Sequence, residues 1–167
     1  LTQSKLAWHC FSQARKEVSL PMNLFITKWL SGDIATGRVM CQRKQRCSSS
    51  CPRCGEDDEH LLHVLTCSFT ETTTLQRKLL SELVEWLRSN NTHPRLALFF
   101  KLGLKQWFDD QTYQWHPSSA IFSDSTTINT ALHSQLQVTW YFLLCGLLTE
   151  DIVSLQQSYF NDIDSKK

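Results

Sequence analysis

The sequence of 167 residues lacks several features that would assign it to a class at once. Its formal net charge is only +1, which argues against a strong autonomous nucleic-acid binder because such domains are usually more basic. Its most apolar run, Val138–Leu148, is too short to span a bilayer and predicts a buried helix. The N-terminus shows neither a signal peptide nor an initiator methionine, so we expect a fragment of a longer polypeptide.

Convincing strand patterns and internal repeats are also missing. Instead, apolar residues recur at helical spacing, and a hydrophobic content of 41% with six tryptophans supports a packed core. We therefore expect an all-α fold, a helical bundle in which a short cysteine-rich segment separates N-terminal from C-terminal helices. The expected helices run over residues 4–18, Pro21 to Gly32, Leu75 to Asn90, Pro94 to Trp107, Thr127 to Leu148 and Thr149 to Ile163, with a long loop over 109–126 that contains Trp115.

Residues 51–67 interrupt the helical pattern with three cysteines and two histidines. Cys51 and Cys54 form a C-x2-C pair followed by Gly55, which suits a tight turn that points both thiolates at one ion. His63 and Cys67 are four residues apart, which on a helix places both side chains on one face. Thiolate and imidazole are zinc ligands, and four protein ligands are typical of a closed, structural site.

Several alternatives stay open for this motif. His60 is a reserve ligand, although His63 leaves more chain after Cys54 for a loop and a first helical turn. A catalytic zinc with an open position, reduced cysteines without metal, and a disulfide are further alternatives. The acidic run Glu56–Glu59 indicates a helix start, with Asp57 or Asp58 as the cap. Of the four other cysteines, Cys47 lies just upstream of the motif, and Cys10, Cys41 and Cys145 fit reduced, buried thiols.

Three groups of residues occur in a recognisable order. The first is Lys28–Gly32 with Thr36 and Gly37; the second is Cys51–Gly55 with Glu59 and His63–Cys67; the third is Gln135, Val138, Thr139, Trp140, Leu144, Gly146, Thr149, Gln156 and Tyr159. This order resembles the zinc-binding region of reverse-transcriptase-like proteins from non-LTR retrotransposons. The chain departs from that family at Thr139, where glycine is usual, at Ile152, where tryptophan is frequent, and in the additional His60.

The resemblance implies a zinc-stabilised accessory module downstream of polymerase or nuclease domains. The chain itself has no paired aspartates of a polymerase or ribonuclease H type. Its partners would be RNA or DNA and an upstream polymerase domain, with no membrane and no small-molecule substrate. Together with the reduced cysteines it implies an intracellular location, nuclear or cytoplasmic. We divide the chain into N-terminal helices and a basic approach (1–46), the zinc knuckle (47–68) and a C-terminal helical bundle (69–167).

A basic cluster near the knuckle predicts nucleic-acid binding through phosphate contacts. It consists of Arg38, Arg43, Lys44, Arg46 and Arg53. Trp29 can stack on an unpaired base, although core packing is the commoner role for a tryptophan on an apolar stripe. The alternative is a structural or protein-interaction zinc module without direct nucleic-acid contact. An enzyme is disfavoured, because no spacing joins the polar residues that a nuclease-like site would need, namely His93, His116, His133, Asp109, Asp110 and Asp124.

Overall fold

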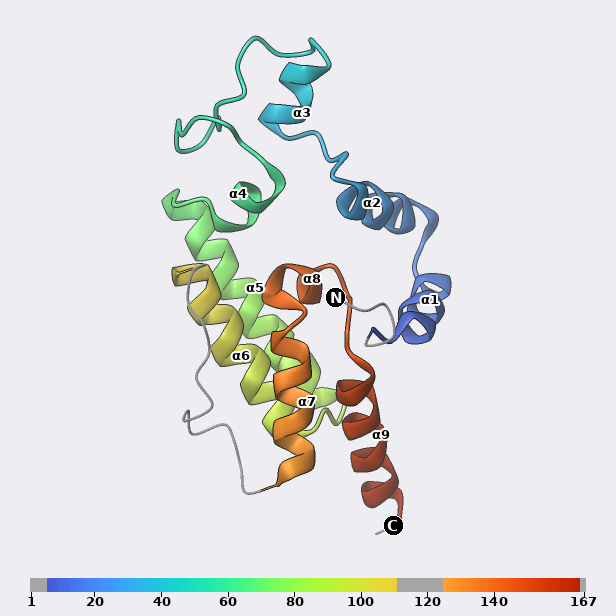
Figure 1. Cartoon of the computed structure of the whole chain (residues 1–167). Helices are drawn as coiled ribbons and strands as arrows, with labels where there is room; N and C mark the ends of the chain where they lie inside the picture. The colour runs from blue at the N-terminus through green and yellow to red at the C-terminus, as the bar shows by residue number, and fades with distance from the viewer. Residues whose placement is uncertain (1–5, 111–124, 166–167) are drawn as a thin grey trace. The chain divides into compact units, whose positions relative to one another are not determined.

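The computed structural model describes residues 6–110 and 125–165, and these residues form α-helices and no strand (Figure 1). The predicted all-α fold is therefore confirmed. The helices are α1 (Trp8–Glu17), α2 (Leu20–Ser31), α3 (Gly37–Gln42), α4 (Leu61–Thr66), α5 (Thr70–Ser89), α6 (Pro94–Asp109), α7 (Thr126–Leu136), α8 (Thr139–Leu144) and α9 (Glu150–Asp164). None of the helices in the described ranges combines the length and the apolar character that a bilayer crossing requires.

The chain divides into two compact units, which we treat separately. The knuckle unit comprises Ala14–Arg77, and the bundle unit comprises Leu1–Gln13 together with Lys78–Lys167. In the bundle unit α7 packs against α6, α8 and α9. Its largest fully buried apolar side chains are Leu96, Phe99, Leu104, Leu132 and Val138.

Gly103 sets the distance between α6 and α8. A Cβ atom at this position would overlap the indole ring of Trp140, so only glycine lets the two helices approach this closely. Trp140 is 7% exposed and lies against Phe99, with ring centroids 5.0 Å apart. The glycine inside the predicted helix is thus explained by packing across the bundle unit.

The single helix predicted over Thr127 to Leu148 is wrong, because the structure has two helices there. The first ends at Leu136 and the second begins at Thr139. Thr139 has φ = 70°, a left-handed conformation that β-branched residues rarely adopt. Glycine adopts positive φ without steric penalty, whereas threonine does so only with strain. The break is therefore a backbone feature that periodicity alone does not reveal.

Two glutamines connect elements of the bundle unit, Gln135 from a buried position and Gln156 from a half-buried one. The side chain of Gln135, which is 2% exposed, donates to the Leu147 carbonyl at 3.2 Å and accepts the Thr149 N–H at 2.9 Å. The Gln156 side chain accepts the His93 N–H at 2.8 Å and donates to the Asn91 carbonyl at 3.1 Å. Both glutamines satisfy backbone groups at element ends that would otherwise lack partners.

Most predicted helix limits agree with the structure to within a few residues. Pro21 lies in the first turn of α2, and Gly32 ends that helix with φ = 74°, as predicted. Thr149 is the residue before α9, but its hydroxyl makes no capping hydrogen bond. The predicted loop over 109–126 lies largely outside the described residues, as does Trp115.

Candidate metal centre

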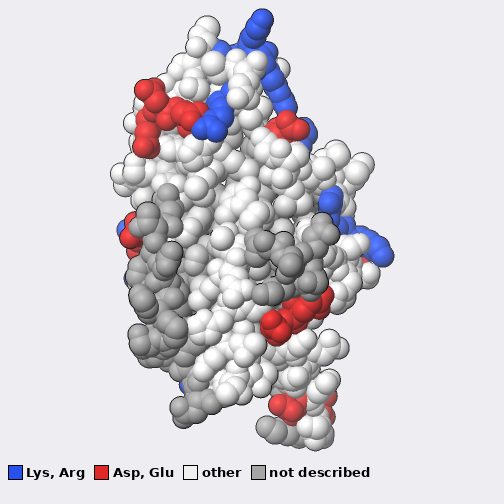
Figure 2. Space-filling model, viewed as in Figure 1, with Lys and Arg blue, Asp and Glu red and all other residues white. Residues whose placement is uncertain are grey.

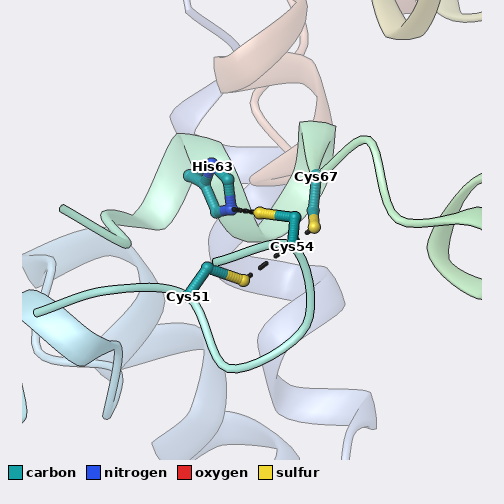
Figure 3. A group of neighbouring side chains, drawn as sticks. All are labelled: Cys51, Cys54, His63 and Cys67. Carbon is teal, nitrogen blue, oxygen red and sulfur yellow. Dashed lines mark hydrogen bonds between the residues drawn. The ribbon is translucent and has the colours of Figure 1, made fainter. Parts of the chain in front are cut away.

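The first half of the centre is a tight turn over Cys51 to Gly55. The Gly55 N–H donates to the Cys51 carbonyl at 2.9 Å, and the Cys51 N–H donates to the Glu56 carbonyl at 2.8 Å. Gly55 has φ = 76°, which explains why glycine follows the second cysteine. The turn brings the thiols of Cys51 and Cys54 to one side of the loop (Figure 3).

The second half is α4, which carries His63 and is followed directly by Cys67. His60 precedes the helix, and its Nδ1 accepts the His63 backbone N–H at 3.1 Å. The predicted cap by Asp57 or Asp58 is therefore wrong: His60 is the N-cap. This capping bond also gives His60 a role outside the ligand group.

Four ligand atoms converge between the turn and α4 (Figure 3). These atoms lie within 4.8 Å of one another and belong to Cys51, Cys54, His63 and Cys67. Within residues 6–110 and 125–165, these four residues form the group that could hold a metal ion. Cys51 Sγ lies 3.9 Å from Cys67 Sγ, and Cys54 Sγ lies 3.3 Å from His63 Nε2. A tetrahedral zinc ion with Zn–S bonds of about 2.3 Å would separate two sulfurs by about 3.8 Å, so the donor set fits that ion.

The three thiols influence one another's protonation. The Glu56 backbone N–H lowers the pKa of the Cys54 thiol, but burial and the other two thiols outweigh it, so that this pKa is raised. Burial raises the pKa of the Cys67 thiol, but the Phe69 N–H and the neighbouring side chains outweigh it, so that this pKa is lowered. Cys67 is 2% exposed and Cys51 is 3% exposed, so both sulfurs are withdrawn from solvent. Cys54 is half-buried, so the shielding of the group is partial.

The four acidic residues that precede α4 make four separate contacts and do not form the start of a helix. Each carboxylate meets a different partner, and all four partners lie elsewhere in the knuckle unit. Glu56 Oε2 lies 3.3 Å from His63 Nδ1, Asp57 accepts the Ser50 hydroxyl at 3.1 Å, Asp58 pairs with Arg38, and Glu59 accepts the Gly37 N–H at 2.6 Å.

Glu59 connects the centre to α3. Its carboxylate accepts the Gly37 N–H, and its carbonyl accepts the Arg38 N–H at 3.1 Å. Gly37 is buried, and a Cβ there would clash with the Ser49 carbonyl and lie 3.1 Å from the Glu59 Cβ. Thr36 caps the same helix end, with its hydroxyl 3.4 Å from the Val39 nitrogen. The Thr36-Gly37 pair noted in the sequence is therefore the point where α3 docks on the knuckle loop.

The predicted basic cluster is largely engaged within the knuckle unit. Arg38 forms a two-bond contact with Asp58, and Arg43 lies 2.8 Å from the Asp33 carboxylate. Lys44 has an exposed side chain and φ = 57°, at the turn that follows α3.

The two remaining members of the cluster also have contacts. Arg46 Nη1 lies 4.0 Å from the Glu59 carboxylate, and Arg53 donates to the Thr72 hydroxyl at 3.3 Å. Trp29 is half-buried and packs on Phe25, with ring centroids 5.8 Å apart. The arginines of the basic cluster thus form contacts within the knuckle unit as well as lying at its surface.

The residues considered for a nuclease-like site do not form a group of metal ligands among the described residues. His93 caps α6, where its Nδ1 accepts the Arg95 N–H at 3.1 Å, and its ring lies edge-on to Tyr159. Asp109 is the last residue of α6, while His133 lies on α7. His116 and Asp124 lie outside the described residues.

Sequence reasoning missed the tertiary roles of two acidic residues. Glu56 contacts the candidate ligand His63 and Glu59 contacts Gly37, whereas the sequence predicts a helix start for both. A carboxylate two residues after a C-x2-C pair was the available signal for Glu56.

No family model, curated protein or solved structure matches this chain.

Proposed function

We propose that the chain is a zinc-stabilised accessory module in which Cys51, Cys54, His63 and Cys67 hold one structural zinc ion. The observation that carries this proposal is the convergence of three thiols and one imidazole within 4.8 Å. Sulfur-rich tetrahedral sites select zinc, and four protein ligands leave no open position for catalysis. When bound, the ion supplies a cross-link between the turn and α4.

The cross-link stabilises a unit with little core of its own. None of the residues of α2 is buried, and the buried positions of the unit cluster around the centre. Zinc binding contributes apparent free energies of about 10–16 kcal/mol in small zinc peptides. Even a fraction of this energy matters against a domain stability of about 5–15 kcal/mol.

We infer a binding role for the module, not a catalytic one, within a longer reverse-transcriptase-like protein of a retroelement. The motif order from Lys28 to Tyr159 supports this context. An upstream polymerase domain is the proposed protein partner. A reducing compartment, the cytoplasm or nucleus, is part of the proposal, because thiols that hold a metal ion must stay reduced.

A structural and protein-binding role accounts better for the charges than a phosphate-binding role does. At the top of the view in Figure 2, acidic and basic side chains of the knuckle unit lie next to one another. Three of the five basic residues lie close to carboxylates: Arg38, Arg43 and Arg46. A zinc ion bound by three thiolates also keeps a net negative charge, which opposes an approaching phosphate.

Nucleic-acid binding is the second candidate, and the position of Lys44 favours it. This exposed lysine lies between Arg43 and Arg46 in sequence, and exposed ion pairs contribute only about 0–1 kcal/mol. A phosphate can therefore replace Asp33 as the partner of Arg43. Such binding would be sequence-independent and would weaken steeply with salt.

Metal analysis tests the central proposal. Purified, reduced protein should contain about one zinc per chain. The Cys51→Ser and Cys67→Ser variants should lose the metal and the folded structure of the knuckle unit. Cys47→Ser is the matched control, because Cys47 is exposed and outside the cluster. Metal-free wild-type protein that keeps its fold would contradict the proposal.

A salt titration separates the two roles. Affinity for single- and double-stranded RNA and DNA is measured for the wild type and for a variant with alanine at positions 43, 44 and 46. Loss of affinity and a shallower salt dependence would support phosphate contacts. The control variant carries alanine at Lys101 and Lys105, two exposed lysines of α6. Equal behaviour of all three proteins would leave the protein-binding role as the better explanation.

A further inference from the structure

The imidazole of His63 is held between two groups on opposite sides of the ring. Its Nε2 lies 3.3 Å from Cys54 Sγ, and its Nδ1 lies 3.3 Å from Glu56 Oε2. The His63 side chain is 10% exposed, while that of Glu56 is 66% exposed. The ring therefore has one nitrogen facing the ligand cluster and the other facing a carboxylate at the surface.

This arrangement determines which nitrogen can bind a metal. A neutral imidazole carries one proton, and only the nitrogen without it offers a lone pair. The Glu56 carboxylate accepts hydrogen bonds but donates none, so it favours a proton on Nδ1. The lone pair is then on Nε2, which is the nitrogen that faces the thiols.

We propose that Glu56 is a positioning residue for the metal centre: it fixes the tautomer and the orientation of His63 so that Nε2 binds the ion. This proposal rests on the zinc site proposed above. The role is specific to Glu56, since the other acids of the run contact Ser50, Arg38 and Gly37.

The backbone holds Glu56 where this contact requires it. Its carbonyl accepts the Cys51 N–H at 2.8 Å, so the same turn that presents the thiols also places the carboxylate. The same Glu56 oxygen that lies 3.3 Å from His63 Nδ1 also lies 4.0 Å from the sulfur of Cys54. Turn, ligands and carboxylate therefore form one local unit of structure.

Replacing such outer partners of metal ligands typically reduces metal affinity by about 10- to 100-fold. Because Glu56 is largely exposed, we expect the lower end of that range, about tenfold, for Glu56→Ala. Glu56→Gln should recover most of the loss, because an amide oxygen can still accept the Nδ1 proton.

The experiment is a competition titration of zinc against a chromophoric chelator, performed on the full chain. It compares the wild type, Glu56→Ala, Glu56→Gln and Asp57→Ala. The last variant is the matched control, since it removes a neighbouring charge without touching His63. Long-range ¹H–¹⁵N correlation spectra of the zinc-bound wild type identify the bound ring nitrogen independently of any variant.

We expect Nε2 coordination, a tenfold weaker affinity for Glu56→Ala, and near-normal affinity for Glu56→Gln and Asp57→Ala. Coordination through Nδ1 would overturn the proposal, as would equal losses for Glu56→Ala and Asp57→Ala or an unchanged affinity for Glu56→Ala. Failure of the wild type to bind zinc would instead overturn the proposed zinc site, and this assignment with it.

Discussion

The carboxylate of Glu59 accepts the backbone N–H of Gly37 at 2.6 Å, across 22 residues of sequence. This bond joins the start of α3 to the loop that leads into α4. The Glu59 side chain is 15% exposed, so water competes only weakly for the bond. The bond therefore connects α3 to the loop that carries the first two candidate metal ligands, Cys51 and Cys54.

Glu59→Ala should loosen α3. The change leaves the Gly37 N–H without its partner, and the loss of a hydrogen bond to a charged group costs about 1.5–3 kcal/mol. Amide hydrogen exchange should accelerate at Gly37 and through α3, while exchange in α7 and α9 stays at the wild-type rate. Gln42→Ala, an exposed change in the same helix, is the control. Unchanged protection of α3 in Glu59→Ala would show that the bond contributes nothing to its order.

Thr139→Gly should stabilise the bundle unit. A non-glycine residue held at φ = 70° costs about 1–3 kcal/mol of strain, and glycine removes most of it. Glycine also makes the unfolded chain more flexible, which offsets about 0.4–1 kcal/mol of the gain. The net gain should be up to about 2 kcal/mol in urea unfolding followed by tryptophan fluorescence. Gln137→Gly, at a helical φ of −66°, is the control and should destabilise the unit.

Gly103→Ala should destabilise the bundle unit. The added methyl group would overlap the Trp140 ring, and overpacking of this kind typically costs about 1–3 kcal/mol. Trp140→Leu should partly relieve the clash, so the two changes together should cost less than the sum of their separate effects. The measurement is a double-mutant cycle in urea. Strict additivity would mean that the methyl group and the indole ring do not compete for space.

Stability of the bundle unit should fall as the pH decreases below about 6.5. Burial lowers the pKa of His93, and the positive charge of Arg95 lowers it further, so the folded unit favours the neutral ring. The unfolded chain takes up the proton first, near pH 6.5, and the stabilisation is lost progressively until the pH passes the lower pKa of the folded state.

The variant His93→Ser tests this pH dependence. Serine can also accept the Arg95 N–H at the helix start but does not titrate in this range. Its unfolding free energy should therefore depend less on pH than that of the wild type between pH 7 and about 5. Parallel curves for the two proteins would exclude His93 as the source.

Local sequence patterns predicted those features that depend on neighbours along the chain. The C-x2-C pair with Gly55 needs only a tight turn, and His63 and Cys67 need only one helical turn between them. The stop of α2 at Gly32 and the start of α6 at Pro94 likewise follow from the backbone preferences of single residues.

Tertiary structure decided the features that depend on distant partners. Periodicity could not show that Thr139 breaks a helix, because the break depends on a backbone conformation and not on the apolar pattern. The basic cluster suggested a free positive surface, yet Arg38 and Arg43 meet Asp58 and Asp33 only once the loops are folded.

The sequence by itself therefore determined an all-α chain and the residues able to form a Cys3His centre, since helical periodicity and ligand spacing are local properties. Only the folded chain decided that His60 caps α4, that Glu56 faces His63 and that Glu59 holds α3. The physical reason is that the adjacent acidic residues Glu56–Glu59 all have the same local preference for a loop or a helix start. Their separate roles arise from the groups that folding brings within hydrogen-bonding distance.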